Sequence, residues 1–175
     1  GRGVVLVAST CSQPLVCNPR VGVKSLRELI AKARVEKIDY ASCGAGVPGH
    51  LAMELLLDAA KVNMQHIPYK GPAPATQDVI GGQVPLLAMN ALEVKPHVAS
   101  GKLRVLAVLS PARSPIFPDV PTIAESGFPG FEASVWYALL APAATPHPVL
   151  ERLHAQLQKA SQTNDMRERM TAHGG

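Results

Sequence analysis

The stretch from Ile38 to Leu57 constrains the fold of this 175-residue chain more than any other. A short strand-like run leads into a loop that contains Gly44, Gly46 and Gly49, and a helical pattern begins near Pro48. Proline suits the first position of a helix, while glycines allow a sharp turn and a close backbone approach. The order of strand, glycine loop and helix is typical of α/β folds, so we expect an α/β fold here.

The start of this helix is a candidate anion site. The first N–H groups of a helix lack internal partners, and the helix dipole places partial positive charge there. A glycine loop that leads into a helix N-terminus can therefore hold an anion such as a carboxylate. An ordinary strand-to-helix turn, in which the glycines serve geometry only, explains the same residues, and the sequence leaves both interpretations open.

Strand and helix patterns alternate over the first two thirds of the chain. Apolar runs predict strands at 4–8, 14–17, 38–41, 64–67, 84–89 and 104–109, with helices between them, one of which starts at a capping box formed by Ser25 and Glu28. This alternation predicts a mostly parallel sheet with helices on its faces. After a proline-rich loop at 110–130, we expect a strand at 132–140, a helix at 146–160 with an apolar stripe, and a last helix at 165–172.

Composition argues against several classes of function. The net charge is only +4 with no run of like charge, and aromatic residues make up 4% of the chain, so a nucleic-acid surface is not supported. No apolar run approaches the length of a membrane span. The scattered histidines lack metal-ligand spacing, and no cofactor or metal is expected. Whether Cys11 and Cys17 pair stays open.

Two enzymatic alternatives start from the same loop. Gly44 to Gly49 reads GxGxxG after a strand and before a helix, which is the dinucleotide-binding pattern, but the next strand ends in Pro68 and Tyr69 with no acidic residue to hold a ribose. Cys43 precedes the helix N-terminus, where a thiolate would be stabilised, and could act as a nucleophile. An α/β enzyme that uses the loop for a nucleotide, or Cys43 for catalysis, is therefore the alternative to a binding protein without catalytic residues.

Several longer motifs carry a family resemblance. The segments YASCGAGVPGHLAMELL, HIPYKGPAPATQDVIGGQV, PHVASGKLRVLAV and RSPIFPDVPTIAESGFPGFEASVWYALLAPAATP follow one another almost without gaps. In this order they resemble the Bug family, the TctC-type solute-binding receptors of tripartite tricarboxylate transporters. The resemblance covers nearly the whole chain and is more specific than any single glycine loop.

The resemblance implies a periplasmic-binding-protein-like α/β fold of the Venus-flytrap type, of which this chain supplies mainly the second lobe. By this comparison residues 1–13 form a crossing segment, residues 14–130 the second lobe, and residues 131–175 a crossing strand with returning helices of an incomplete first lobe. We therefore expect a truncated, periplasmic solute-binding protein that captures a small carboxylate. Its implied partners are that ligand and the membrane components of a tripartite transporter, without nucleic acid and without direct membrane insertion.

The resemblance also implies which residues bind the ligand. Beside the family pattern S-A-G-x-G-T-P-S-H-L, the chain departs at Cys43, Val47 and Gly49, and the loss of a threonine hydroxyl at Val47 removes a potential helix cap. Met89 occupies a position that is acidic in some members, which favours a plain carboxylate over an amino acid. The expected ligand-binding residues are Ser42, Cys43, Gly44, Ala45, Gly46, Val47, His50, Tyr69 and Asn90.

Overall fold

The computed structural model describes residues 3–166 and 168. The elements run in the order β1 (Gly3–Cys11), β2 (Pro14–Cys17), η1 (Pro19–Val21), α1 (Leu26–Ala33), β3 (Asp39–Ser42), α2 (Pro48–Ala60), β4 (Gln65–Pro68), α3 (Pro72–Gly81), β5 (Leu86–Ala88), α4 (Ala91–Ala99), β6 (Arg104–Val108), β7 (Val135–Ala141) and α5 (His147–Ser161). The alternation predicted from sequence is thus confirmed. The helix predicted at 165–172 lies largely outside the described residues.

Five strands form the main sheet in the order β4-β3-β5-β2-β6. Strand β3 pairs in parallel with β4 and β5, whereas β2 pairs antiparallel with both β5 and β6. The sheet is therefore mixed: four strands share one direction, but half of the pairings are antiparallel. The sequence expectation of a mostly parallel sheet missed the direction of β2, which pairs with β5 and β6 and not with β3, the next strand along the chain.

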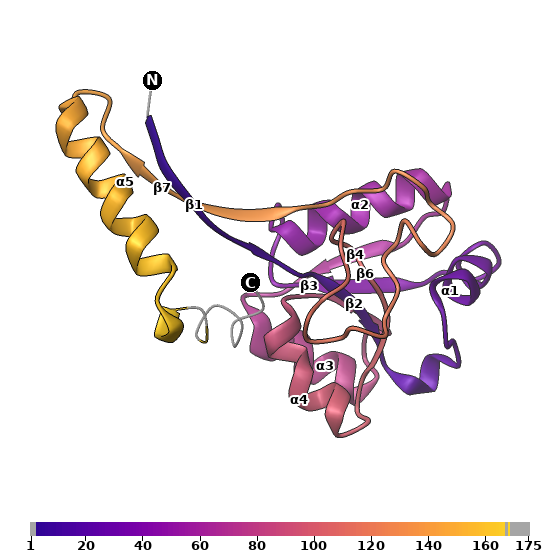
Figure 1. The fold of residues 1–175 in the computed structure, drawn as a ribbon. Helices are drawn as coiled ribbons and strands as arrows, with labels where there is room; N and C mark the ends of the chain where they lie inside the picture. The colour runs from indigo at the N-terminus through magenta and orange to yellow at the C-terminus, as the bar shows by residue number, and fades with distance from the viewer. Residues whose placement is uncertain (1–2, 167, 169–175) are drawn as a thin grey trace.

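Helices cover both faces of this sheet. On β2, Leu15 and Cys17 face one apolar cluster with α1 and α2, and the residue between them, Val16, faces a second cluster with α3 and α4. The same alternation separates Tyr40 from Ala41 on β3. Figure 1 shows α3 and α4 on the opposite side of the sheet from α2. The inner strands β2, β3 and β5 are buried on both faces, which explains why they read as apolar runs.

Strand β5 and helix α2 each show a further detail of this packing. Strand β5 is shorter than the predicted run at 84–89, because Pro85 lacks the N–H that a ladder needs, and it begins at Leu86 in the middle of the sheet. On α2, Ala52 and Leu56 face the sheet, while Leu51 and Leu55 remain 54% exposed. These two leucines border a hollow of about 430 Å³ between α2 and residues 132–135.

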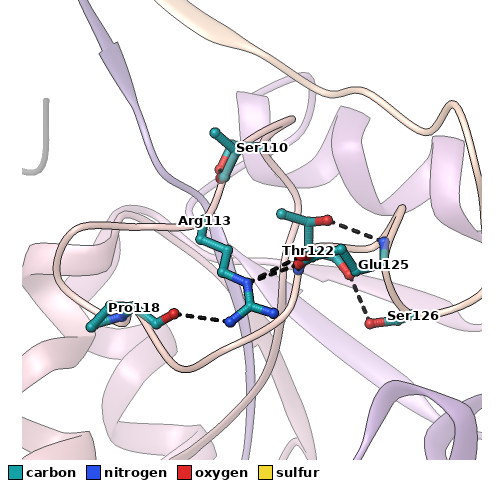
Figure 2. Close-up of polar contacts among 7 residues, drawn as sticks. Ser110, Arg113, Pro118, Thr122, Glu125 and Ser126 are labelled. Carbon is teal, nitrogen blue, oxygen red and sulfur yellow. Dashed lines mark hydrogen bonds and ion pairs between the residues drawn. The ribbon is translucent and has the colours of Figure 1, made fainter.

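A polar cluster ties down the long connection from β6 to β7. Arg113 Nε donates to both carboxylate oxygens of Glu125, at 3.2 and 3.0 Å, and its guanidinium also donates to the carbonyl of Pro118 (Figure 2). Glu125 in turn accepts from the amide of Thr122, and the Thr122 hydroxyl accepts from the amide of Glu125. These reciprocal bonds form a capping box around the turn at 122–126.

The first and last parts of the described chain form a separate unit. Strands β1 and β7 pair antiparallel in a two-stranded sheet that extends away from the main sheet, and α5 packs beside β1 (Figure 1). The strand predicted at 132–140 and the helix predicted at 146–160 are thus present. No residue of α5, which is described in full, is buried.

Candidate functional site

The residues expected to bind ligand lie at one edge of the main sheet. Strands β4, β3 and β5 are parallel neighbours, so the loops after Ser42, Pro68 and Ala88 leave the sheet at the same edge. Backbone bonds join two of these loops: the amide of Tyr69 donates to the Ser42 carbonyl at 3.0 Å, and the amide of Gly71 donates to the Cys43 carbonyl at 3.3 Å. The expected convergence of the three loops is confirmed, while their contact with a ligand stays a prediction.

The glycines of the first loop have different structural roles. Gly44 and Gly46 adopt φ of +153° and +76°, values that side-chain-bearing residues rarely adopt. Gly49 instead allows close packing, because a Cβ at this position would lie 2.5 Å from the carbonyl oxygen of Ala88. Glycine at this position therefore lets the first turn of α2 lie directly against β5.

Helix α2 begins without a side-chain cap. Val47 occupies the N-cap position and makes no capping bond, and Pro48 follows at the first helical position. The expected consequence of valine replacing threonine is therefore present: the first-turn amides of Gly49 and His50 receive no side-chain oxygen from the N-cap. Ala45 and Gly46, just before the helix, are exposed to solvent.

The Ser42 side chain holds the beginning of the loop through hydrogen bonds to the loop backbone. Its side chain is fully buried, and its hydroxyl lies 2.7 Å from the Gly44 carbonyl, to which it donates. The same oxygen lies 2.6 Å from Nε2 of His66 and accepts from the Gly44 amide at 3.3 Å. These contacts shape the loop, and they direct the hydroxyl toward protein groups.

His50 holds the middle of the loop. Its Nδ1 accepts a hydrogen bond from the Gly46 amide at 2.9 Å. Its Nε2 lies 3.7 Å from Oε1 of Glu54, one turn further along α2, and that oxygen also accepts from the Tyr40 hydroxyl at 2.6 Å. The loop is thus connected through one imidazole to a carboxylate and a phenol.

The two histidines stack against each other. The ring centroids of His50 and His66 are 3.8 Å apart at an interplanar angle of 14°, and the Tyr40 ring stacks with both, at 5.0 Å from His66 and 6.4 Å from His50. Burial lowers the pKa of His66 below its usual value, and the neighbouring His50 lowers it further, while Glu54 opposes the shift. Burial and the bond to Glu54 raise the pKa of Tyr40, which keeps the phenol neutral.

Tyr69 and Asn90 each have a structural partner at this edge. The Tyr69 hydroxyl donates to Oδ2 of Asp78 on α3 at 2.7 Å, and burial together with this bond raises its pKa to about 12. The Asn90 side chain caps α4, because its Oδ1 accepts from the Leu92 amide at 3.1 Å. The Tyr69 backbone borders the glycine loop, Asn90 follows β5 at the same edge of the sheet, and these two polar atoms serve the scaffold.

The surroundings of Cys43 disfavour its thiolate form. Burial raises the pKa of its thiol, and the nearby carboxylate of Glu93 raises it further. The sequence-based expectation that a thiolate would be stabilised here is therefore wrong, because the desolvation of the site outweighs the backbone hydrogen bond that favours the charged form. Cys17 is likewise a free thiol, fully buried in the core, and its pKa is raised to about 11.

Sequence analysis missed three members of this site, namely Tyr40, Glu54 and His66. From sequence, His66 is only one of the scattered histidines without metal-ligand spacing. One signal existed in the sequence, because His50 and Glu54 are four residues apart in the predicted helix, whereas Tyr40 and His66 meet only as register partners on β3 and β4. Only the strand register, which sequence does not reveal, brings these two pairs together.

Within the described residues, no group of three or more histidine, cysteine or acidic side chains is arranged to hold a metal ion. No helix in that part of the chain has the length and apolar character needed to cross a bilayer.

Comparison with known proteins gives a consistent result. Residues 3–175 match the family model of the tripartite tricarboxylate transporter family receptor, TctC. Protein BugT of Bordetella pertussis is 42% identical over 164 residues, covering 91% of this chain and 50% of BugT. A solved R. palustris protein with adipate superposes with a TM-score of 0.85 at 30% identity, over 99% of this chain and 58% of that one. MatC from Rhodopseudomonas palustris with bound malate gives 0.83 at 28% identity, over 99% and 60%.

The chain spans about half the length of the curated relatives it matches, 52% and 50% for the first two. The family match nonetheless includes the glycine loop, all five strands of the main sheet and the two-stranded β1–β7 sheet. By sequence and by fold, this chain belongs to the TctC family of solute-binding receptors.

Proposed function

We propose that this chain serves in a periplasmic receptor that captures a small carboxylate for a tripartite tricarboxylate-type transporter, and that it acts by binding rather than by catalysis. In this proposal residues 14–130 are one lobe of a two-lobed receptor, and residues 1–13 and 131–175 belong to the connection with the other lobe. Family membership supports the receptor role, and the adipate and malate in the two related structures support a carboxylate as the ligand.

The observation that carries the proposal is the uncapped start of α2 beside the exposed turn at Ala45 and Gly46. The first-turn amides and the dipole of a 13-residue helix attract a carboxylate. Tyr69 and Asn90 border the same edge, and Lys70 adds an exposed cation there. The remaining expected contacts, Ser42, Cys43, Gly44 and Val47, would support the loop around the ligand.

The test is calorimetry with malate and adipate on the wild type and on a Gly46→Val variant. Valine at a φ of +76° forces the loop out of its shape, although nothing lies within 4 Å of the added Cβ, so binding should be lost. Gly101→Val is the matched control, because Gly101 has a φ of +71° and equally open surroundings in the turn after α4.

Affinity in the wild type should be weak, on the order of micromolar to millimolar, because the loop is open to solvent and little of the ligand would be desolvated. A nucleotide serves as the negative control. Carboxylate binding that persists in Gly46→Val, or heat released by the nucleotide and not by the carboxylates, would reject the loop as a carboxylate site.

A further inference from the structure

The hydrogen bond from the Gly46 amide to His50 depends on the protonation of the imidazole. Nδ1 of His50 accepts this bond at 2.9 Å, and a nitrogen that accepts must carry a lone pair. The loop therefore has its present shape with His50 neutral and its remaining ring proton on Nε2, on the side of Glu54. Protonation of Nδ1 would turn the acceptor into a second donor that faces the amide.

Three elements surround the His50 ring with titratable groups. Glu54, on the same helix, places Oε1 3.7 Å from Nε2. From β4, the His66 ring stacks at 3.8 Å, and from β3, the Tyr40 ring lies 6.4 Å away with a neutral hydroxyl that donates to Glu54. Two stacked imidazoles do not both carry charge easily, and Nε2 of His50 has a carboxylate oxygen, Oε1 of Glu54, within 3.7 Å.

We propose that His50 is a proton-operated latch on the glycine loop, which holds the Gly46 amide when neutral and releases it to a ligand carboxylate when protonated. The ligand part of this inference rests on the proposed function. His50 acts here as a positioning residue, because it controls the backbone donor at Gly46.

The protonated state creates a place for an anion. The Nδ1–H of His50 and the amide of Gly46 would then point toward each other as two donors, and one carboxylate can accept from both. Binding of a carboxylate and protonation of His50 therefore favour each other, as linkage requires. With one proton taken up, we expect the affinity for malate or adipate to be about tenfold higher at pH 6 than at pH 8.

The first test is calorimetry with malate and adipate at pH 6, 7 and 8 on the wild type, His50→Asn and His50→Gln. Asparagine places an acceptor oxygen close to the position of Nδ1 and keeps the latch closed at every pH, so binding should be weaker and should change less than about twofold with pH. Glutamine lacks an acceptor at that position and should also remove the pH dependence. His147→Asn, on the exposed first turn of α5, is the control and should retain it.

The second test needs no ligand. The amide resonance of Gly46, followed by NMR between pH 8 and pH 5, should move with the titration of an imidazole in the wild type and in His147→Asn, and should stay fixed in His50→Asn. If neither malate nor adipate binds at any pH, the proposed function fails, and the Gly46 resonance alone decides the latch. A Gly46 amide that ignores pH in the wild type, or a pH-dependent affinity that survives in both His50 variants, would overturn the latch.

Discussion

Helices α2 and α5 are both long and both carry an apolar stripe, yet the protein uses them differently. Six of the 13 residues of α2 are buried, whereas none of the 15 residues of α5 is. Met53 and Leu56 on α2 are completely enclosed, while Val149 and Leu153 on α5 remain 46% and 45% exposed. The difference lies in what each helix packs against, since α2 lies on a five-stranded sheet and α5 beside a two-stranded one.

This contrast teaches that an apolar stripe predicts a helix but does not predict its burial. A two-stranded sheet offers too little surface to enclose the side chains of a helix, and such a sheet is marginal by itself in water. Each leucine that is fully buried stabilises the folded state by about 1.5–3 kcal/mol. The partly exposed stripe of α5 contributes much less than this per residue. The five-stranded unit should therefore dominate the stability of the chain.

The largest expected effect is in hydrogen exchange. Amides of α2 open only with the global unfolding of the five-stranded unit, whereas those of α5 open locally at low cost. In a dilute monomeric sample, the amides from Leu150 to Leu157 should exchange about a thousandfold faster than those from Met53 to Leu57. Strong protection of α5 in a species shown to be monomeric would mean that α5 is packed as firmly as α2.

A pair of leucine truncations sharpens the same comparison. Leu56→Ala removes a completely buried side chain from α2 and should lower the free energy of unfolding by about 2–5 kcal/mol. Leu153→Ala on α5 should lower it by less than about 1 kcal/mol, because that side chain is 45% exposed. Urea denaturation of both variants is the measurement. Equal losses would show that α5 is as well packed as α2 in solution.

A pair of glycine substitutions tests the close contact beneath α2. In Gly49→Ala the new Cβ would lie 2.5 Å from the Ala88 carbonyl oxygen, so the helix or the strand must shift. We expect a loss of about 1–3 kcal/mol in the free energy of unfolding, measured in urea. Gly81→Ala, at the end of α3, has nothing within 4 Å and should change it by less than about 0.5 kcal/mol. A neutral Gly49→Ala would mean that α2 sits further from β5 than the structure has it.

Much of the five-stranded unit could be predicted from local signals. Ser25 caps α1 as expected, since its hydroxyl accepts from the Glu28 amide at 3.2 Å, although Glu28 reaches back to the Lys24 amide and not to that of Ser25. Pro48 begins α2 as predicted. These features depend on neighbours within a few residues in sequence, which is the range over which propensity and capping act.

The parts that could not be predicted depend on pairing between distant segments. The antiparallel direction of β2 follows from its neighbours β5 and β6, and no residue of the run at 14–17 encodes it. The polar connections of His66 likewise require the register of β4 against β3 to be known. The sequence predicted where the glycine loop would lie. It missed Tyr40, Glu54 and His66, whose side chains connect to this loop.

The smallest expected effect concerns the connection that leads from the five-stranded unit toward β7. The hydrogen bond from Arg113 and the bond from the Thr122 amide lower the pKa of Glu125 below its usual value (Figure 2). A carboxyl whose pKa is lowered by folding stabilises the folded state at pH values above its unfolded pKa, which is about 4.3 for glutamate. This stabilisation is lost as the pH falls through the pKa of the folded state. The protection of the Ser126 amide, which donates to the Thr122 carbonyl at 3.1 Å, should therefore be higher at pH 5.5 than at pH 3.5.

Because both side chains of this ion pair are about half exposed, salt and solvent screen it, and the change should remain within about fivefold. Arg113→Gln should lower the protection of Ser126 at pH 5.5 and reduce its dependence on pH, while Arg152→Gln on the exposed face of α5 should leave both unchanged. Such a result would place the cluster around Glu125 between the two regions in stability. If Ser126 instead exchanges as fast as α5 at every pH, the connection belongs with the weakly packed region, and the boundary between the two regions lies at the end of β6.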